Sequence, residues 1–316
     1  MARRRTGACP GAGHMTTVVG SLNLDMVARV TALPAEGETV LATGYEEHGG
    51  GKGANQALAA ARAGAPVRLV GRVGRDGAGQ RLVEALAHAG VDVTKVEAVD
   101  AATGRAWIEV DDAGANRIVV VPGANAAWAA RELGTLFDAD TEPSGWLLLQ
   151  REVPDDVILE AARQAVAAGV PVMLNAAPAG PLPNGLAGLL TTLVVNEHEA
   201  ANLLERPEDV VLADVMDAAR ALLEMGPAEV VITLGADGAV FASRAEAIQE
   251  PAFAVEVVDT TAAGDTFVGA FATRRGEGAG VRDALRFACA AAAEAVRVAG
   301  AQSSIPLRAA IEARLG

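Results

Sequence analysis

Aromatic side chains are scarce in this chain of 316 residues, where phenylalanine, tyrosine and tryptophan together make up 3%. Hydrophobic residues of all kinds still reach 51%, so alanine, valine and leucine must do most of the packing. With 21% charged residues, this composition is typical of a globular protein. The length exceeds that of one small core and fits one large α/β domain with an accessory element.

Cysteine and histidine are also scarce. The two cysteines, Cys9 and Cys289, cannot form a disulfide framework and fit a reducing cytoplasm. The four histidines are scattered, without the Cys/His spacing of a metal site. No apolar run reaches the roughly 18–20 residues of a membrane helix. We therefore expect a cytoplasmic protein with no membrane partner.

The N-terminal segment has basic residues but lacks the apolar stretch of a secretory signal. We expect residues 1–14 to be a disordered tail and residues 15–316 to form the folded domain. Met15, directly before the first apolar segment, is an alternative to Met1 as the true start.

Positive charge is in deficit, which gives a formal net charge of -14. An acidic surface repels nucleic acid and anionic membranes, so we expect neither as a partner. A small local site can still bind an anion such as ATP against this global field.

Short apolar segments alternate with helical patterns along most of the chain. We expect strands at 16–20, 67–70, 146–149, 172–175, 193–196 and 230–234, and helices at 55–63, 78–89, 154–168, 211–225, 264–275 and 282–299. This alternation predicts βαβ units and an α/β fold with a parallel sheet covered on both faces. Residues 24–47 and 103–121 break the rhythm and are expected to form a small separate β-sheet, a lid over a ligand site.

The segment from Asp259 to Phe267 carries the sharpest chemical signal. Small residues precede Gly264 and Asp265, and a helical pattern follows, so free backbone N–H groups there form an anion site. A carboxylate at such a site makes sense if Asp265 takes a proton from a hydroxyl while the amides hold a transferring phosphoryl group. The structural alternative is that Asp265 is a helix N-cap.

A second glycine-rich segment runs from Gly49 to Asn55. It is not a Walker loop, because Gly53 follows Lys52 where serine or threonine is required, and it lacks the acidic partner of a Rossmann fingerprint. Its glycines let backbone N–H groups approach a polar ligand. Lys52 is one of two lysines in an arginine-rich chain, which indicates a need for a compact cation or is chance.

Three further segments follow expected strands. Asn23 and Asp25 lie two residues apart, a pair suited to vicinal hydroxyls or to a turn. Glu199 either steers Mg²⁺ through water or stands in a helix start capped by Asn196. The segment 233–238 either approaches a nucleotide or forms a hairpin.

Taken in order, these segments resemble the ribokinase (PfkB-type carbohydrate kinase) family over residues 16–308. The early signature is GGKGANQALAAARAG (50–64) followed by GRVGRDGAG (71–79), and the late one is DTTAAGDTFVGAF (259–271). The pieces GSLNLD, QREVP, NAAPAG, NEHEA and TLGADG stand between them in the family's order. The resemblance implies a three-layer α/β/α domain with a mostly parallel central sheet and a small β-sheet lid, often a dimer contact. We therefore expect a homodimer.

The resemblance also implies a reaction: transfer of the ATP γ-phosphate to a sugar hydroxyl, in ribokinases the 5-hydroxyl of ribose. Asp265 would be the general base, with the backbone amides of Ala262, Ala263 and Gly264 as the anion hole. The implied sugar-binding positions are Asn23, Asp25, Gly50, Gly51, Lys52, Asn55 and Glu152, together with Asp265. The implied nucleotide positions are Asn196, Thr233, Gly235, Gly238, Gly264 and Cys289.

Two cations are implied beside ATP. Glu199 occupies the position linked to Mg²⁺. A monovalent cation, usually K⁺, would bind mostly through carbonyl oxygens at Asp259, Thr261, Ala295, Val298, Gly300 and Ser304.

The identity of the sugar stays open, because Gly49 and Arg151 depart from the family's usual residues. A related kinase for deoxyribose, a nucleoside or another sugar is the alternative within the class. A sugar-binding sensor without catalysis is a second alternative, and the intact Asp265 argues against it. An NAD-dependent dehydrogenase is excluded by the missing fingerprint.

Overall fold

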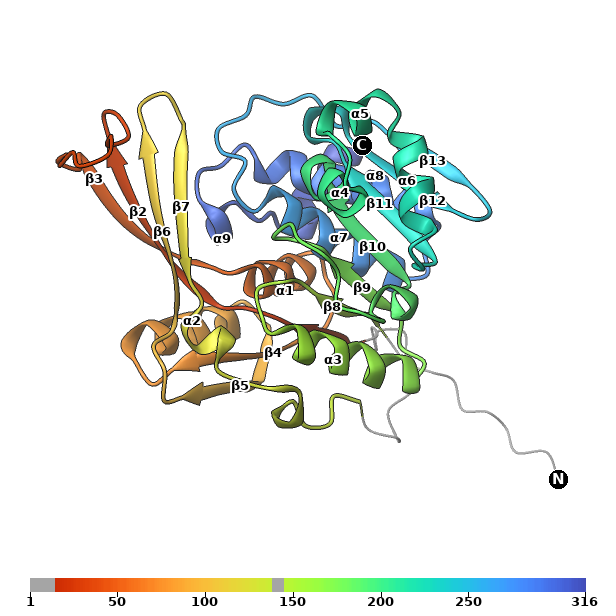
Figure 1. The fold of residues 1–316 in the computed structure, drawn as a ribbon, viewed down its shortest axis with the longest axis horizontal. Helices are drawn as coiled ribbons and strands as arrows, with labels where there is room; N and C mark the ends of the chain where they lie inside the picture. The colour runs from red at the N-terminus through yellow and green to blue at the C-terminus, as the bar shows by residue number, and fades with distance from the viewer. Residues whose placement is uncertain (1–14, 138–144) are drawn as a thin grey trace.

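A nine-stranded sheet forms the centre of the chain in the computed structural model, which describes residues 15–137 and 145–316 (Figure 1). The expected tail, residues 1–14, lies outside the described residues. In spatial order the sheet consists of β13 (Ala247–Glu250), β12 (Ala239–Ser243), β11 (Glu229–Thr233), β10 (Thr192–Asn196), β9 (Val172–Asn175), β8 (Leu147–Leu149), β1 (Thr16–Val19), β4 (Val67–Gly74) and β5 (Asp92–Val99). The pairs from β5 to β11 are parallel, and β12 and β13 add an antiparallel edge.

Helices cover both faces of this sheet. The described residues contain the helices α1 (Lys52–Arg62), α2 (Gly77–His88), α3 (Asp155–Ala167), α4 (Glu197–Leu204), α5 (Glu208–Ala213), α6 (Val215–Leu223), α7 (Ala263–Gly276), α8 (Val281–Ala295), α9 (Ala301–Ser304) and α10 (Arg308–Leu315). One buried cluster joins the sheet to α1, α2, α7, α8 and α10, and another joins it to α3, α4 and α6. The three-layer α/β/α arrangement expected from the sequence is confirmed.

The central strands are apolar along their whole length because both faces are covered. Val18 faces the first cluster and Val19 the second, and both are fully buried. Because aromatic side chains are few, alanine fills much of the core between the helices. In α8 the stretch from Ala288 to Ala291 is buried, which lets this helix pack closely on α7.

A second sheet of four strands projects from the main body (Figure 1). Its order is β3 (Gly44–Gly50), β2 (Asn23–Val30), β6 (Gly104–Asp111) and β7 (Asn116–Val121). The expected turn between its last two strands is present, with Asp111 accepting hydrogen bonds from the N–H groups of Ala113 and Ala115. Residues 31–43 connect β2 to β3 without strand or helix.

Some expected elements were wrong in extent. The helix expected at 211–225 is two helices, since Asp214 leaves helical geometry and its side chain caps α6 at the N–H of Asp217. The helix expected at 282–299 ends at Ala295, because the following backbone turns to meet residues 258 and 259. Strands β5, β12 and β13 were missed: β5 and β13 mix polar and apolar residues at the edges of the sheet.

Helix α7 lies inside the molecule, with every residue from Asp265 to Thr273 buried. It crosses α1 at Gly269, where a Cβ atom would lie 2.6 Å from Ala59 Cβ and 2.7 Å from the Gln56 carbonyl oxygen. Thr273 Oγ1 donates to the Ala60 carbonyl oxygen at 3.3 Å. A glycine at the crossing therefore sets how closely α1 and α7 approach.

Gly269→Ala is expected to lower the free energy of unfolding by about 1–3 kcal/mol, because the added methyl meets backbone atoms of α1 that cannot move aside cheaply. Gly276→Ala on the same helix is the matched control. Its Cβ would lie 3.7 Å from Trp146, so stability should be unchanged or slightly higher. Urea unfolding of both variants checks this, and equal effects would contradict the close crossing.

Candidate active site

Asp265 lies in the first turn of α7 but is not its N-cap. The cap residue is Ala262, in left-handed geometry at φ 60, and Asp265 is the third helical residue. Its side chain makes no cap hydrogen bond and turns instead toward α1. The N-cap interpretation of Asp265 is therefore wrong, and the strained backbone at Ala262 marks a site where geometry is enforced by its surroundings.

Both carboxylate oxygens of Asp265 accept hydrogen bonds from neighbouring residues of α1. Asn55 Nδ2 donates to Oδ2 at 3.0 Å, and Gln56 Nε2 donates to Oδ1 at 2.9 Å. Asp265 is only 7% exposed, so these bonds stabilise a buried carboxylate. Asn55 Oδ1 is buried without a partner among the described residues, an acceptor left for a bound hydroxyl.

The carboxylate of Glu152 sits at the junction of three segments. Its Oε2 accepts from Ser21 Oγ at 2.5 Å and from the Lys52 backbone N–H at 3.0 Å. The Gly53 N–H donates to Ser21 Oγ at 3.3 Å. Sequence segments far apart are thus fixed around one carboxylate.

Asn23 and Asp25 lie on strand β2, not in a turn. Side chains two residues apart share one face of a strand, as expected. A Cβ at Gly50 would lie 2.0 Å from Asp25 Oδ2, and one at Gly51, at φ +88, would lie 2.7 Å from the Asn23 backbone nitrogen. Both glycines are therefore required by the close approach of β2.

Gly49 faces away from Asp25, since it alternates with Gly50 along β3. The place of its missing Cβ is filled by Gln302 of α9, whose Oε1 lies 2.5 Å away. Arg151 turns to the carbonyl oxygen of Pro178 at 3.1 Å. Neither departure from the family pattern adds a charge or a void beside Asp25.

The electrostatics of this group are unusual. Burial, reinforced by the carboxylates of Glu152 and Asp265, raises the pKa of Asp25 from 3.8 to about 7. Burial opposes the charge of Lys52, but the surrounding carboxylates, Asp265 first, hold its pKa above the ordinary value. Burial also raises the pKa of Glu199. Perturbed groups gathered in this way are typical of functional sites.

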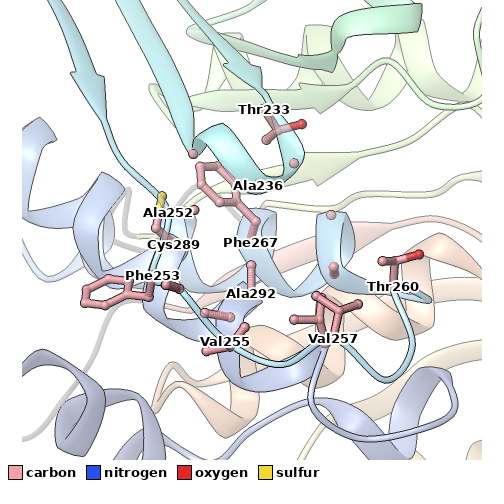
Figure 2. A pocket seen from close by; sticks show the side chains of 17 residues that line it. Thr233, Ala236, Ala252, Phe253, Val255, Val257, Thr260, Phe267, Cys289 and Ala292 are labelled. Atoms are coloured by element: carbon pink, nitrogen blue, oxygen red, sulfur yellow. The ribbon is translucent and has the colours of Figure 1, made fainter.

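A largely apolar cavity of about 480 Å³ lies beside the start of α7 (Figure 2). Thr233, Gly235, Gly238, Gly264 and Cys289 are the expected nucleotide residues that line it. In Figure 2, Thr233 and Ala236 border it on the β11–β12 side, and Val255, Val257 and Thr260 border it on the opposite side. The volume and lining fit a flat, uncharged ring such as a nucleobase.

Asn196 does not line this cavity, but it pairs with Thr233 in the sheet. Its side chain caps α4 by accepting from the Glu199 N–H at 2.8 Å, and Glu199 Oε2 accepts from the Asn196 N–H at 2.9 Å. The helix-start interpretation of this segment is confirmed. The β11–β12 hairpin is confirmed as well, and it borders the cavity.

Backbone N–H groups gather where α7 begins. The Ala263 N–H donates to the Thr260 carbonyl oxygen at 3.2 Å. The N–H groups of Ala262 and Gly264 make no hydrogen bond to the described part of the chain. Two of the three expected anion-hole donors are therefore free to bind an anion, and the third is engaged in a turn.

The segments expected to hold a monovalent cation converge. Asp259 Oδ1 accepts from Thr261 Oγ1 at 2.6 Å, and Oδ2 accepts from the Gly300 N–H at 2.8 Å. The Val258 N–H donates to the Val296 carbonyl oxygen at 2.8 Å. Within residues 15–137 and 145–316, no three His, Cys, Asp or Glu side chains gather as a metal site.

Four buried polar residues of the site were missed by sequence reasoning: Ser21, Gln56, Asn125 and Gln150. Asn125 Nδ2 donates to Asn23 Oδ1 at 2.7 Å, and Gln150 Nε2 donates to Gln56 Oε1 at 2.6 Å. Gln56 adjoins Asn55, and Ser21 and Gln150 lie two residues from Asn23 and Glu152. Asn125 has no such neighbour, and only the fold brings it to β2.

The fold and the site define a kinase of small molecules. The chain belongs to the pfkB family of carbohydrate kinases, which matches residues 14–308. No helix in the described part of the chain is long and apolar enough to cross a membrane.

Several relatives are similar over nearly the whole chain. The ribokinase of Bacillus subtilis is 39% identical over 300 residues, covering 93% of this chain and 97% of that protein. The bifunctional ribokinase/ribose-5-phosphate isomerase A of Fructilactobacillus sanfranciscensis is 38% identical, and this chain spans 55% of its length. The deoxyribokinase of Salmonella typhi is 33% identical, with 92% and 94% coverage.

The fold is also similar to that of a solved ribokinase structure. The Arabidopsis thaliana ribokinase, complexed with ribose and ATP, superposes with a TM-score of 0.86 at 36% identity. The match covers 96% of this chain and 99% of that chain.

Asp25 should make the stability of the ligand-free protein depend on pH. Because folding raises its pKa to about 7, the folded state binds the proton more tightly, and stability present below pH 3.8 is lost as pH rises through 7. Between about pH 5 and 8 the wild type should lose roughly 2–3 kcal/mol relative to Asp25→Asn. Denaturant unfolding at several pH values measures this.

Asp112→Asn is the control, since Asp112 is exposed in the β6–β7 turn. It should follow the wild-type pH dependence. Parallel curves for the wild type and Asp25→Asn would contradict the burial of an Asp25 carboxyl in this cluster.

Proposed function

We propose that this protein transfers the γ-phosphate of ATP to the 5-hydroxyl of D-ribose, giving ribose 5-phosphate and ADP. The observation that carries the proposal is the placement of the buried Asp265 carboxylate between a polar cluster and an apolar cavity. The cluster contains Asn23, Asp25, Lys52, Asn55 and Glu152, and the cavity begins at Gly264. Relatives named ribokinase support ribose as the sugar.

The sugar is held on the polar side. Asp25 and Glu152 accept or share hydrogen bonds with ring hydroxyls, and Lys52 supplies a compact cation beside them. Asn55 offers its unpartnered Oδ1. The backbone at Gly50 and Gly51 completes the wall. The four-stranded sheet, which carries Asn23 and Asp25, acts as the lid.

The nucleotide lies on the other side of α7. Its base occupies the apolar cavity, where burial raises the pKa of the Cys289 thiol to about 12 and keeps it neutral. Asn196, Thr233, Gly235 and Gly238 border the sugar and phosphates of ATP. The phosphate end then points to the N–H groups at the start of α7.

The proposed chemical step transfers a proton to Asp265 and a phosphoryl group to the sugar. The proton of the ribose 5-hydroxyl passes to an Asp265 carboxylate oxygen as the hydroxyl oxygen bonds to the γ-phosphorus. The bond from the γ-phosphorus to the bridging oxygen breaks, and its electron pair leaves with ADP. The free N–H groups of Ala262 and Gly264 stabilise the charge on the transferring group.

The donor sets fit two cations. Glu199 presents a buried carboxylate, a hard oxygen ligand that suits hydrated Mg²⁺, which when bound neutralises phosphate charge. K⁺ fits carbonyl oxygens from the converging segments at Asp259, Thr261, Ala295, Val298, Gly300 and Ser304. The Asp259 carboxylate accepts hydrogen bonds from the N–H groups of Thr261 and Gly300, and these bonds tie the segments to the anion hole.

Deoxyribose is the alternative sugar, because one relative of 33% identity is named a deoxyribokinase. Purified protein assayed with Mg-ATP, K⁺ and a panel of ribose, deoxyribose, fructose and adenosine decides between them. Ribose should give the highest kcat/KM. Turnover of ribose no better than that of fructose or adenosine would remove ribose as the substrate.

Asp265→Asn is expected to lower kcat by roughly 10²–10⁴ while leaving ribose binding nearly intact, because the amide keeps the shape but cannot take a proton. Steady-state kinetics and calorimetric ribose titration measure the two effects. Asp209→Asn, at an exposed position of α5, is the control and should keep the wild-type kcat. Near-normal kcat in Asp265→Asn would show that another group is the base.

The lid also supports a homodimer. All six residues of β7 are exposed, and Val119 lies opposite Trp107 on the lid face away from Asp25. Val119 is 61% exposed and Trp107 is 43% exposed. Their side chains form an apolar patch that a second copy of the chain would cover. The cytoplasmic location expected from the composition stays a prediction.

Val119→Asp is expected to convert the dimer to a monomer, because a charge at the centre of an apolar interface would be buried unpaired. Light scattering at micromolar concentration measures the mass. Val166→Asp on α3, where Val166 is 48% exposed, is the control and should stay dimeric. A monomeric wild type would contradict the proposed interface.

A further inference from the structure

Two buried glutamines have no part in the proposed chemistry, although each lies within two residues of a site residue. Gln56 follows Asn55 on α1, and Gln150 follows β8, two residues before Glu152. Both side chains are fully buried at 0% exposure. A buried amide is unfavourable unless its polar atoms are hydrogen-bonded, so the partners of these glutamines are informative.

Every polar atom of the Gln56 amide has a partner. Nε2 donates to Asp265 Oδ1 at 2.9 Å and to Asn175 Oδ1 at 3.1 Å. Oε1 accepts from Gln150 Nε2 at 2.6 Å. The chain of bonds runs from Gln150 through Gln56 to the Asp265 carboxylate.

The chemistry of these groups determines which side-chain atom donates and which accepts in each hydrogen bond of the series. An ionised carboxylate only accepts hydrogen bonds, so Gln56 must present Nε2 to Asp265. Its Oε1 then faces Gln150, which must present Nε2 in turn. Rotating either amide by half a turn would place two oxygens against each other.

The place of Gln150 is set by backbone as well. A Cβ at Gly20, at the end of β1, would lie 2.0 Å from Gln150 Oε1. That glycine leaves the space in which the Gln150 side chain lies. The series of hydrogen bonds therefore begins at Gln150, whose Oε1 has no partner within the described residues, and ends on the Asp265 carboxylate of α7.

The charged groups around Asp265 do not fix its orientation in the same way. Lys52 on α1, Asp25 on β2, Glu152 after β8 and Glu199 on α4 act on this site through space. No hydrogen bond joins any of their side chains to Asp265 within the described residues. Only the side-chain amides of Asn55 and Gln56 are hydrogen-bonded to the Asp265 side chain within the described residues. Asn55 is also proposed to bind the sugar.

We propose that Gln56, itself oriented by Gln150, is a positioning residue that holds the Asp265 carboxylate in one orientation for proton transfer. The inference rests on the proposed role of Asp265 as the base. It separates the two amides: Asn55 contributes to sugar binding, whereas Gln56 acts on the rate alone.

The test is steady-state kinetics of Gln56→Met and Gln150→Met, each made with Asp265 and with Asp265→Asn. Gln56→Met should lower kcat roughly 10- to 100-fold, while KM for the sugar changes by less than about threefold. With Asp265→Asn, neither glutamine substitution should lower kcat further.

Gln150→Met should lower kcat by about a factor of a few, again only when Asp265 is present. Thermal unfolding and ATP binding establish whether Gln56→Met folds. If it does not fold, Gln150→Met is the variant that tests the inference. Gln164→Met on α3 is the matched control. Gln164 is hydrogen-bonded to Gly134 and Glu160, which are not residues of the proposed site, so kcat should be unchanged.

Losses of equal size with Asp265 and with Asp265→Asn would overturn the inference, since they would show a structural role. An unaltered kcat in Gln56→Met would overturn it as well. Failure of the proposed function gives a different result, a wild type that phosphorylates no sugar. If the preferred sugar is not ribose, the same comparison is made with that sugar.

Discussion

Two consecutive side chains of α1 hold both oxygens of the Asp265 carboxylate on α7, and the rest of the site depends on this contact. It requires the two helices to approach closely, which a glycine at position 269 permits. It also requires a buried carboxylate to be matched by N–H donors, since an unmatched one would be costly. One oxygen acceptor of Asn55 is left without a partner within the described residues.

Around that contact the chain separates a polar side from an apolar side. The polar side gathers carboxylates and one lysine so closely that burial raises the pKa of Asp25 to about 7. The apolar side is a cavity whose walls come from the β11–β12 hairpin, α7 and α8. The N–H groups of Ala262 and Gly264 at the start of α7 are free within the described residues. In the proposed reaction they stabilise the phosphoryl group as it passes between the two sides.

The sequence predicted the layered fold well, because buried parallel strands read as apolar runs and helices show their caps and glycines. It misjudged the edges: β5 and β13 mix polar with apolar residues, and Asp214 divides one helical pattern into two. The site was predicted through ordered motifs rather than through single residues. Asp265 by itself favoured a helix cap, and only the fold, which brings Asn55 and Gln56 against it, excludes that interpretation. Asn125 could not be predicted, since its contact with Asn23 spans the chain between β2 and the segment after β7.

The central claim is that the Asp265 carboxylate faces the hydroxyl that receives the phosphate. A crystal structure with ribose and a non-hydrolysable ATP analogue tests it most directly. The account predicts an Asp265 oxygen within hydrogen-bonding distance of the ribose 5-hydroxyl, with that hydroxyl in line with the γ-phosphorus and Gln56 still bound to the other oxygen. A sugar bound with its 5-hydroxyl beyond reach of Asp265, or with another side chain between them, would contradict it.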